Sequence, residues 1–64
     1  MENFINLCKV IIDTNGNLSV QDVLNCGFDM EMFKRVTMPP IKAEQLVKNA
    51  REALRARKIY YKEN

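Results

Sequence analysis

The sequence predicts an all-α domain of three short helices and one long basic C-terminal helix. Apolar residues recur at helical spacing in the first and last segments of the chain, and helix-capping residues precede two short apolar segments between them. Glycine and proline residues fall between the four segments, where they end helices. Because the chain has 64 residues, we expect residues 1–64 to form a single small domain.

The first helix is predicted over residues 2–13, where apolar side chains line one helical face: Met1, Phe4, Ile5, Cys8, Ile11 and Ile12. A β-hairpin is the alternative, with strands over 10–14 and 17–20 around Asn15 and Gly16, because Asn-Gly is a strong hairpin signal. The same pair also ends helices, where a residue must adopt a positive φ. We therefore favour the helix.

A second short helix is predicted over residues 20–26. Ser19 can cap its N-terminus, and Asp22, three residues later, can return a hydrogen bond as an acidic first-turn partner. Gly27 then ends the helix.

A third short helix is predicted over residues 30–36 by the same pattern. Asp29 is the expected cap, and Phe28 and Phe33 can pack across it as a hydrophobic staple. This helix carries the largest side chains in the middle of the chain, so we expect one of its faces to contribute to the core.

The last helix is predicted from near Pro40, over about residues 41–61, with a continuous apolar stripe: Ala43, Leu46, Val47, Ala50, Ala53 and Leu54. A helix of about 21 residues is about 32 Å long. A globule of this size is about 28 Å across, so the helix should overhang. Its last turns could be an exposed basic arm, a frayed end or a contact with a second copy, and the overhang predicts a homodimer.

Charge is divided unevenly along the chain, although its formal net charge is only +2. Residues 1–33 carry one base and five acids, and residues 34–64 carry nine bases and three acids. A basic C-terminal half can bind phosphate groups or an acidic face of a protein. The alternative is that these bases only solvate the outer face of a helix.

The sequence offers little for catalysis. It has no histidine, its one serine is expected to act as a cap, and two glycines cannot build a phosphate-binding loop. Cys8 and Cys26 show no metal-ligand spacing and are expected to be buried thiols. We expect a protein that is not an enzyme, without cofactor, metal or small-molecule substrate.

No segment has the pattern of a membrane span or a secretory signal. The longest apolar run, residues 10–12, is far shorter than the roughly 20 residues that a spanning helix needs. An acid follows Met1, and Lys9 interrupts the first apolar stretch. These features predict a cytoplasmic protein that does not contact membranes.

The middle of the chain resembles small DNA-binding regulators of the helix-turn-helix and winged-helix type over residues 4–36. The resemblance is carried by residues 18–36, which read LSVQDVLNCGFDMEMFKRV. Gly27 stands where that family has a glycine in the tight turn, and apolar residues flank it: Val23, Phe28, Phe33 and Val36. The resemblance implies a small regulator that binds duplex DNA.

The predicted recognition helix departs from the family pattern, because Asp29 and Glu31 occupy its first turn, where they would repel phosphates. Only Lys34 and Arg35 could contact DNA from this helix, so most of the contacts should come from the last helix and should follow the backbone. The candidate nucleic-acid-binding residues are Lys34, Arg35, Lys42, Lys48, Arg51, Arg55, Arg57 and Lys58.

Binding to a larger protein is the second hypothesis, in which the chain acts as an inhibitor, adaptor or assembly factor. Methionine suits adaptable binding surfaces as well as cores, and Met30 and Met38 fall outside the face that 30–36 is expected to bury. Val10 is expected to point outward from the first helix. The candidate partner-binding residues are therefore Val10, Met30 and Met38.

Overall fold

The computed structural model describes residues 2–38 and 41–63. Within these residues the chain forms four helices and no strand, in agreement with the all-α prediction: α1 (Glu2–Asp13), α2 (Val20–Asn25), α3 (Met30–Thr37) and α4 (Ala43–Ala56). The alternative hairpin over residues 10–20 is therefore wrong. No helix in the described part of the chain is long and apolar enough to cross a membrane.

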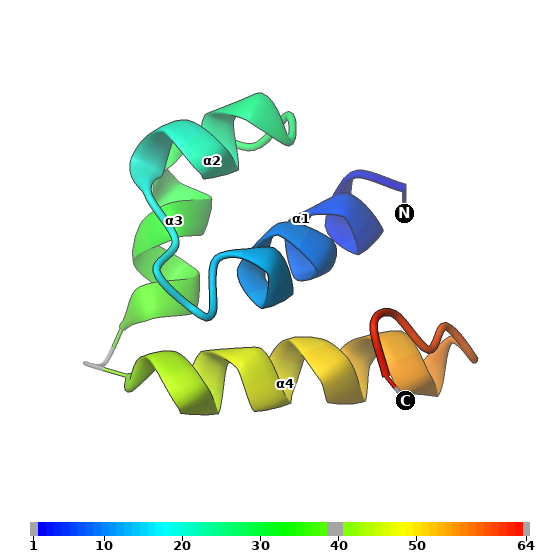
Figure 1. Ribbon diagram of the computed structural model, residues 1–64. Coiled ribbons are helices and arrows are strands. Elements are labelled where there is room, and N and C mark those ends of the chain that lie inside the picture. The colour runs from blue at the N-terminus through cyan, green and yellow to red at the C-terminus, as the bar shows by residue number, and fades with distance from the viewer. Residues whose placement is uncertain (1, 39–40, 64) are drawn as a thin grey trace.

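The helices form two pairs (Figure 1). Helices α1 and α4 lie side by side and run in opposite directions, whereas α2 and α3 form a second pair at one end of the first. The Cα atoms have a radius of gyration of 10.9 Å and extents of 31 × 24 × 17 Å. Because α3 stands at the edge of this arrangement, one of its long faces is left open.

The core lies mainly between α1 and α4. Eight apolar side chains of the described residues are buried: Leu7, Cys8, Ile11, Ile12, Val23, Leu46, Ala50 and Leu54. Helix α2 contributes only Val23, and α3 contributes none. The apolar side of α3, which includes Met32 and Phe33, packs against this cluster and is half-buried.

Helix α1 has the predicted bounds and ends at the Asn-Gly pair. Asn15 and Gly16 adopt φ values of 54° and 84°, and the Gly16 N–H donates to the Ile11 carbonyl at 2.8 Å. This is the hydrogen bond of a Schellman motif, which satisfies a carbonyl left free at the helix end. A Cβ atom on Gly16 would overlap the Ala43 carbonyl, so the turn also needs glycine for its close approach to α4.

Helices α2 and α3 begin at the predicted caps. The Asp22 N–H donates to Ser19 Oγ and the Ser19 N–H donates to Asp22 Oδ2, both at 3.1 Å, which completes a capping box. The Asp29 carboxylate accepts from the Met32 N–H at 3.1 Å. Cys26 is the C-cap of α2 rather than its last residue, and α3 continues one residue beyond its predicted end, to Thr37.

Helix α4 is shorter than predicted. Its predicted start near Pro40 lies outside the described residues, and the helix begins at Ala43. It ends at Ala56 rather than near Tyr61, so its 14 residues span about 21 Å. This length is shorter than the diameter of about 28 Å expected for a globule of this size. The predicted overhang is therefore absent, and with it the geometric reason for expecting a homodimer.

The early end of α4 is produced by Lys58. This residue adopts a φ of 60°, and the N–H groups of Lys58 and Ile59 donate to the carbonyls of Arg55 and Leu54 at 2.8 and 2.9 Å. The pattern is again a Schellman motif, here without glycine. Ile59, the residue after the turn, packs against the core and so stabilises the reversal.

Candidate functional site

The predicted cations do not form one surface. Lys34 and Arg35 are exposed on α3, and Lys42 is exposed at the residue that precedes α4. Lys48, Arg51 and Arg55 are three or four residues apart on α4, so their side chains share one flank of that helix. We call these last three residues the basic flank.

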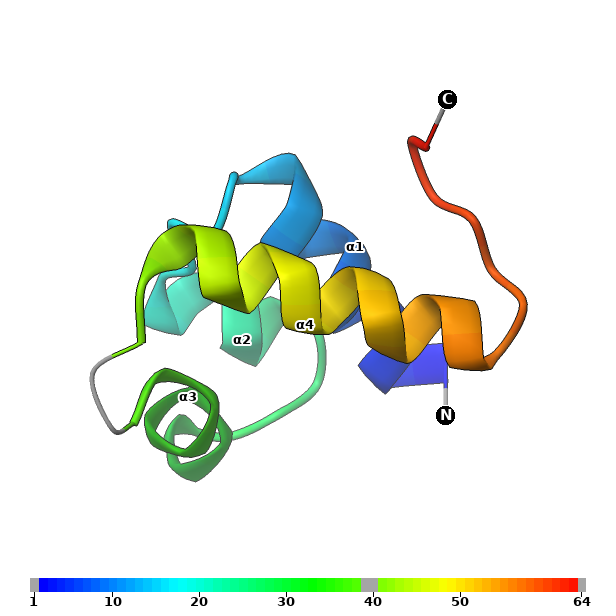
Figure 2. The same ribbon diagram turned by 90° about the horizontal axis from the view of Figure 1, so that it is seen from below.

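Helix α3 lies on the side of α4 opposite the basic flank. Asn49 and Ala53, on the other flank of α4, line an apolar cavity together with Val36 of α3. Figure 2 shows α3 on one side of α4 and the C-terminal residues on the other. Lys34 of α3 and the basic flank of α4 therefore lie on different sides of α4.

Residues 58–63, which we call the strap, turn back from the end of α4 (Figure 2) and contact two residues of the basic flank, Arg51 and Arg55. Arg51 Nη1 donates to the Tyr61 carbonyl at 3.3 Å. Arg55 Nε donates to the two Glu63 carboxylate oxygens at 3.0 and 3.2 Å, and Arg55 Nη2 completes an ion pair with the same group. The hydrogen bond from Arg55 lowers the pKa of Glu63 below its usual value.

The strap also connects to the end of α1. Tyr61 Oη donates to the Asp13 carboxylate at 2.9 Å, and Lys62 Nζ lies 2.6 Å from Asp13 Oδ1. Hydrogen bonds from Lys62, which has the larger effect, and from Tyr61 lower the pKa of Asp13. The Lys9 ammonium lies 5.4 Å from the centre of the Tyr61 ring, within the range of a cation–π contact. Sequence reasoning missed these contacts because they join residues 48 or more positions apart.

The two remaining predicted cations lie at the end of α4. The Arg57 guanidinium stacks 4.8 Å from the centre of the Phe4 ring of α1, and Arg57 Nη1 donates to the Ala53 carbonyl at 2.9 Å. Lys58 is exposed at the start of the strap. Arg57 is therefore engaged within the molecule, whereas the Lys58 side chain extends into solvent.

Two of the three predicted partner-binding residues are exposed. Met30 is 51% exposed and Met38 66% exposed, at the two ends of α3. Val10, which was expected to point outward from the first helix, is half-buried. Sequence reasoning missed Leu24, which is 44% exposed. Its position next to the buried Val23 in a helix of six residues was the available signal, since adjacent helical residues face different directions.

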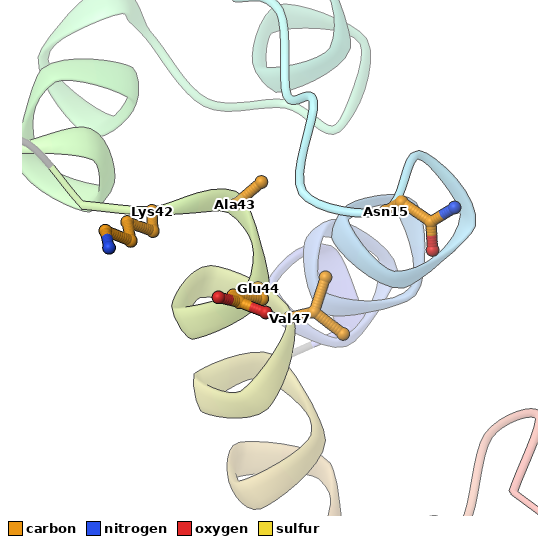
Figure 3. A pocket seen from close by; sticks show the side chains of 5 residues that line it. All are labelled: Asn15, Lys42, Ala43, Glu44 and Val47. Carbon is orange, nitrogen blue, oxygen red and sulfur yellow. The ribbon is translucent and has the colours of Figure 1, made fainter.

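A hollow at the start of α4 is lined by five residues: Asn15, Lys42, Ala43, Glu44 and Val47 (Figure 3). The Lys42 side chain extends away from Asn15 (Figure 3). The three polar side chains that line the hollow, those of Asn15, Lys42 and Glu44, are all exposed to solvent. Because none of them is buried and directed into the hollow, we assign no ligand to it.

The cysteines behave as thiols rather than as ligands. Cys8 is buried and Cys26 half-buried, and both are free. Burial raises the pKa of each thiol, which disfavours the reactive thiolate. No group of three potential metal-ligating side chains lies together among the described residues.

Comparison with known proteins adds no family to this description. No family model matches the chain, and neither a curated protein nor a solved structure is significantly similar to it.

Proposed function

We propose that the chain is a small DNA-associated regulatory protein that binds duplex DNA through the exposed face of α3. The observation that carries this proposal is the position of α3, a helix of eight residues at the edge of the fold with no buried residue. Lys34 and Arg35 on that face can contact phosphates, and Lys42 follows at the start of α4. The proposed DNA surface thus contains three of the eight cations that the sequence suggested as DNA-binding residues.

The connection between α2 and α3 supports a helix-turn-helix interpretation. Only residues 26–29 separate the helices, and Gly27 adopts a φ of 91° in the turn. The Phe28 N–H donates to the Val23 carbonyl at 3.2 Å, which ends α2 and directs the chain into α3. A short turn of this kind is what allows the second helix to be presented to a groove.

The charges of α3 favour contact with the DNA backbone over base recognition. The Asp29 carboxylate is engaged in capping, but Glu31 is exposed in the first turn and would repel phosphates. Two or three cations release few counterions, so binding should be weak and should fall as the salt concentration rises, with a slope of about −2 to −3 in log–log form.

Fluorescence anisotropy with a labelled duplex at low salt tests this proposal. Lys34→Ala and Arg35→Ala are each expected to weaken binding similarly for unrelated sequences. Asn6→Asp is the charge control, because it also lowers the net charge by one, at an exposed position of α1 away from the strap contacts, and should have a much smaller effect. Absence of binding at micromolar protein, or equal losses in all three variants, would contradict the proposal.

A protein-binding modulator is the second candidate function, favoured by the exposure of Met30 and Met38. They lie eight positions apart, about 12 Å along the α3 axis, so one partner could contact both. Met30→Gln and Met38→Gln keep the net charge. These variants should leave the melting temperature and DNA binding unchanged but lose a partner that the wild type retains from nuclease-treated host lysate. Retention by both variants would contradict this function.

A further inference from the structure

The strap conflicts with the helical pattern of its own sequence. From Ala43 to Glu63 the chain contains no glycine and no proline, yet α4 ends at Ala56. The reversal requires a positive φ at two lysines, 60° at Lys58 and 51° at Lys62. Side chains other than glycine are disfavoured in this region because the Cβ atom approaches the following carbonyl oxygen.

The contacts that hold the strap in place are modest. The two ion pairs of the strap, with Asp13 and with Arg55, lie at the surface, where Asp13, Arg55 and Lys62 are exposed and screening weakens ion pairs. Ile59 and Tyr61 pack against the core but are only half-buried. Backbone strain at two residues therefore opposes the folded-back strap, and several weak contacts favour it. When opposing free energies are this close, two conformations can both be populated.

Continuation of α4 through the strap would produce a different surface. The basic flank continues at helical spacing, because Lys58 follows Arg55 by three residues and Lys62 follows Lys58 by four. An extended helix thus carries five cations on one flank: Lys48, Arg51, Arg55, Lys58 and Lys62. Glu63, one residue beyond Lys62, would move off that flank and release Arg55.

We infer that residues 58–63 exchange between the folded-back strap and a continuation of α4, and that the extended form binds the phosphodiester backbone of duplex DNA through this flank. The Glu63 carboxylate and the Tyr61 carbonyl act as internal competitors for Arg55 and Arg51. Guanidinium groups bind carboxylate and phosphate in the same forked geometry, so a phosphate can replace Glu63 on Arg55. A ligand with this preference shifts the strap towards the helix.

The choice of DNA as the ligand rests on the proposed function, whereas the exchange itself does not. This second surface lies on the side of α4 opposite α3, so the two surfaces can be tested independently. Lys34→Ala addresses only α3.

Lys58→Gly and Lys58→Ala form a matched pair that tests the inference. Both remove the same charge, but glycine favours the positive φ of the strap and alanine favours the helix. We expect the ratio of extended to folded-back forms to be at least about tenfold higher in the alanine variant. The ¹³Cα chemical shifts of residues 59–62 should report this as helical shifts in the alanine variant only.

Duplex binding by the same pair completes the test. The alanine variant should bind a labelled duplex at least about fivefold more tightly than the glycine variant at low salt, in the Lys34→Ala background as well as alone. Identical ¹³Cα shifts in the two variants would overturn the exchange, and equal affinities despite different shifts would overturn the DNA-binding role of the flank. If Lys34→Ala by itself abolishes binding, this result shows that α3 binds DNA; it does not test the strap. Circular dichroism confirms that each variant is folded.

Discussion

The two helix pairs of this molecule are stabilised in different ways. Helices α1 and α4 supply seven of the eight buried side chains of the described residues, whereas α2 and α3 supply one. The short pair depends instead on caps, on a glycine turn and on half-buried side chains. A helix that is held mainly by its ends and one packed side can leave its other side free, and this freedom is what makes α3 a candidate binding element.

The largest expected difference between the pairs concerns truncation of core side chains. Leu54 of α4 is 1% exposed, so Leu54→Ala should cost about 2–5 kcal/mol through lost burial and the cavity left behind. Met32 of α3 is half-buried, and Met32→Ala should cost about 1 kcal/mol. Urea denaturation measures both values. Equal losses would show that α3 is as firmly packed as α4.

The next effect compares the glycines that end α1 and α2. Both adopt a positive φ, but a Cβ atom on Gly16 would overlap the backbone of Ala43, whereas one on Gly27 would lie 2.9 Å from the Asn3 side-chain amide. A side chain can move aside more easily than a backbone carbonyl. Gly16→Ala should therefore cost more than about 2 kcal/mol and Gly27→Ala about 1 kcal/mol. Thermal melts of the two variants measure these losses. A lower melting temperature for Gly27→Ala than for Gly16→Ala would show that the turn after α2 constrains the fold more strongly than the α1–α4 contact.

These glycines also show what local sequence can reveal. The Asn15–Gly16 pair fixed the end of α1 to the residue, because the αL requirement of a helix end is a property of adjacent residues. The end of α4 was predicted five residues too late because Lys58 performs the same role without a glycine. The useful signal was Ile59, an apolar residue that could pack back after a turn, but only the tertiary contact with the core distinguishes it from a helical residue.

The candidate site shows the same limit. Helical spacing alone places Lys48, Arg51 and Arg55 on one flank of α4 and could have separated them from the cations of α3. The occupation of Arg55 by Glu63 and of Asp13 by Lys62 depends on how the chain reverses after Ala56. Periodicity carries no information about such contacts, so the sequence predicted the cations and not their availability.

The caps of the short pair should give a smaller and more local effect than the glycines. Asp29→Ala removes the acceptor for the Met32 N–H and should cost about 1 kcal/mol, whereas Asp29→Asn should retain most of the cap. Because α3 has no buried residue, we expect the amide protons of its first turn to exchange faster while those of α1 and α4 change little. Uniformly faster exchange in all helices would instead indicate that α3 unfolds only with the whole domain.

The smallest expected effect concerns acid and the strap that joins α1 to α4. The pKa values of Asp13 and Glu63 are lowered in the folded protein by hydrogen bonds from Lys62 and Arg55 respectively, so folding favours their ionised forms. This contribution to stability is complete above the ordinary carboxyl pKa of about 4 and is lost as the pH falls below it. Asp13 is exposed and Glu63 is half-buried at the surface, so the change should be modest and weaker at high salt.

Melting temperatures between pH 7 and pH 3 measure this effect when the wild type is compared with Asp13→Asn and Glu63→Gln. Each variant should be less stable than the wild type at pH 7, and the difference should shrink as the pH falls, since protonation removes in the wild type what the substitution has already removed. A difference that stays constant down to pH 3 would mean that packing of Ile59 and Tyr61, rather than the two carboxylates, holds the strap on the α1–α4 pair. Acid would then leave the strap in contact with Arg51 and Arg55, so pH would not control their release.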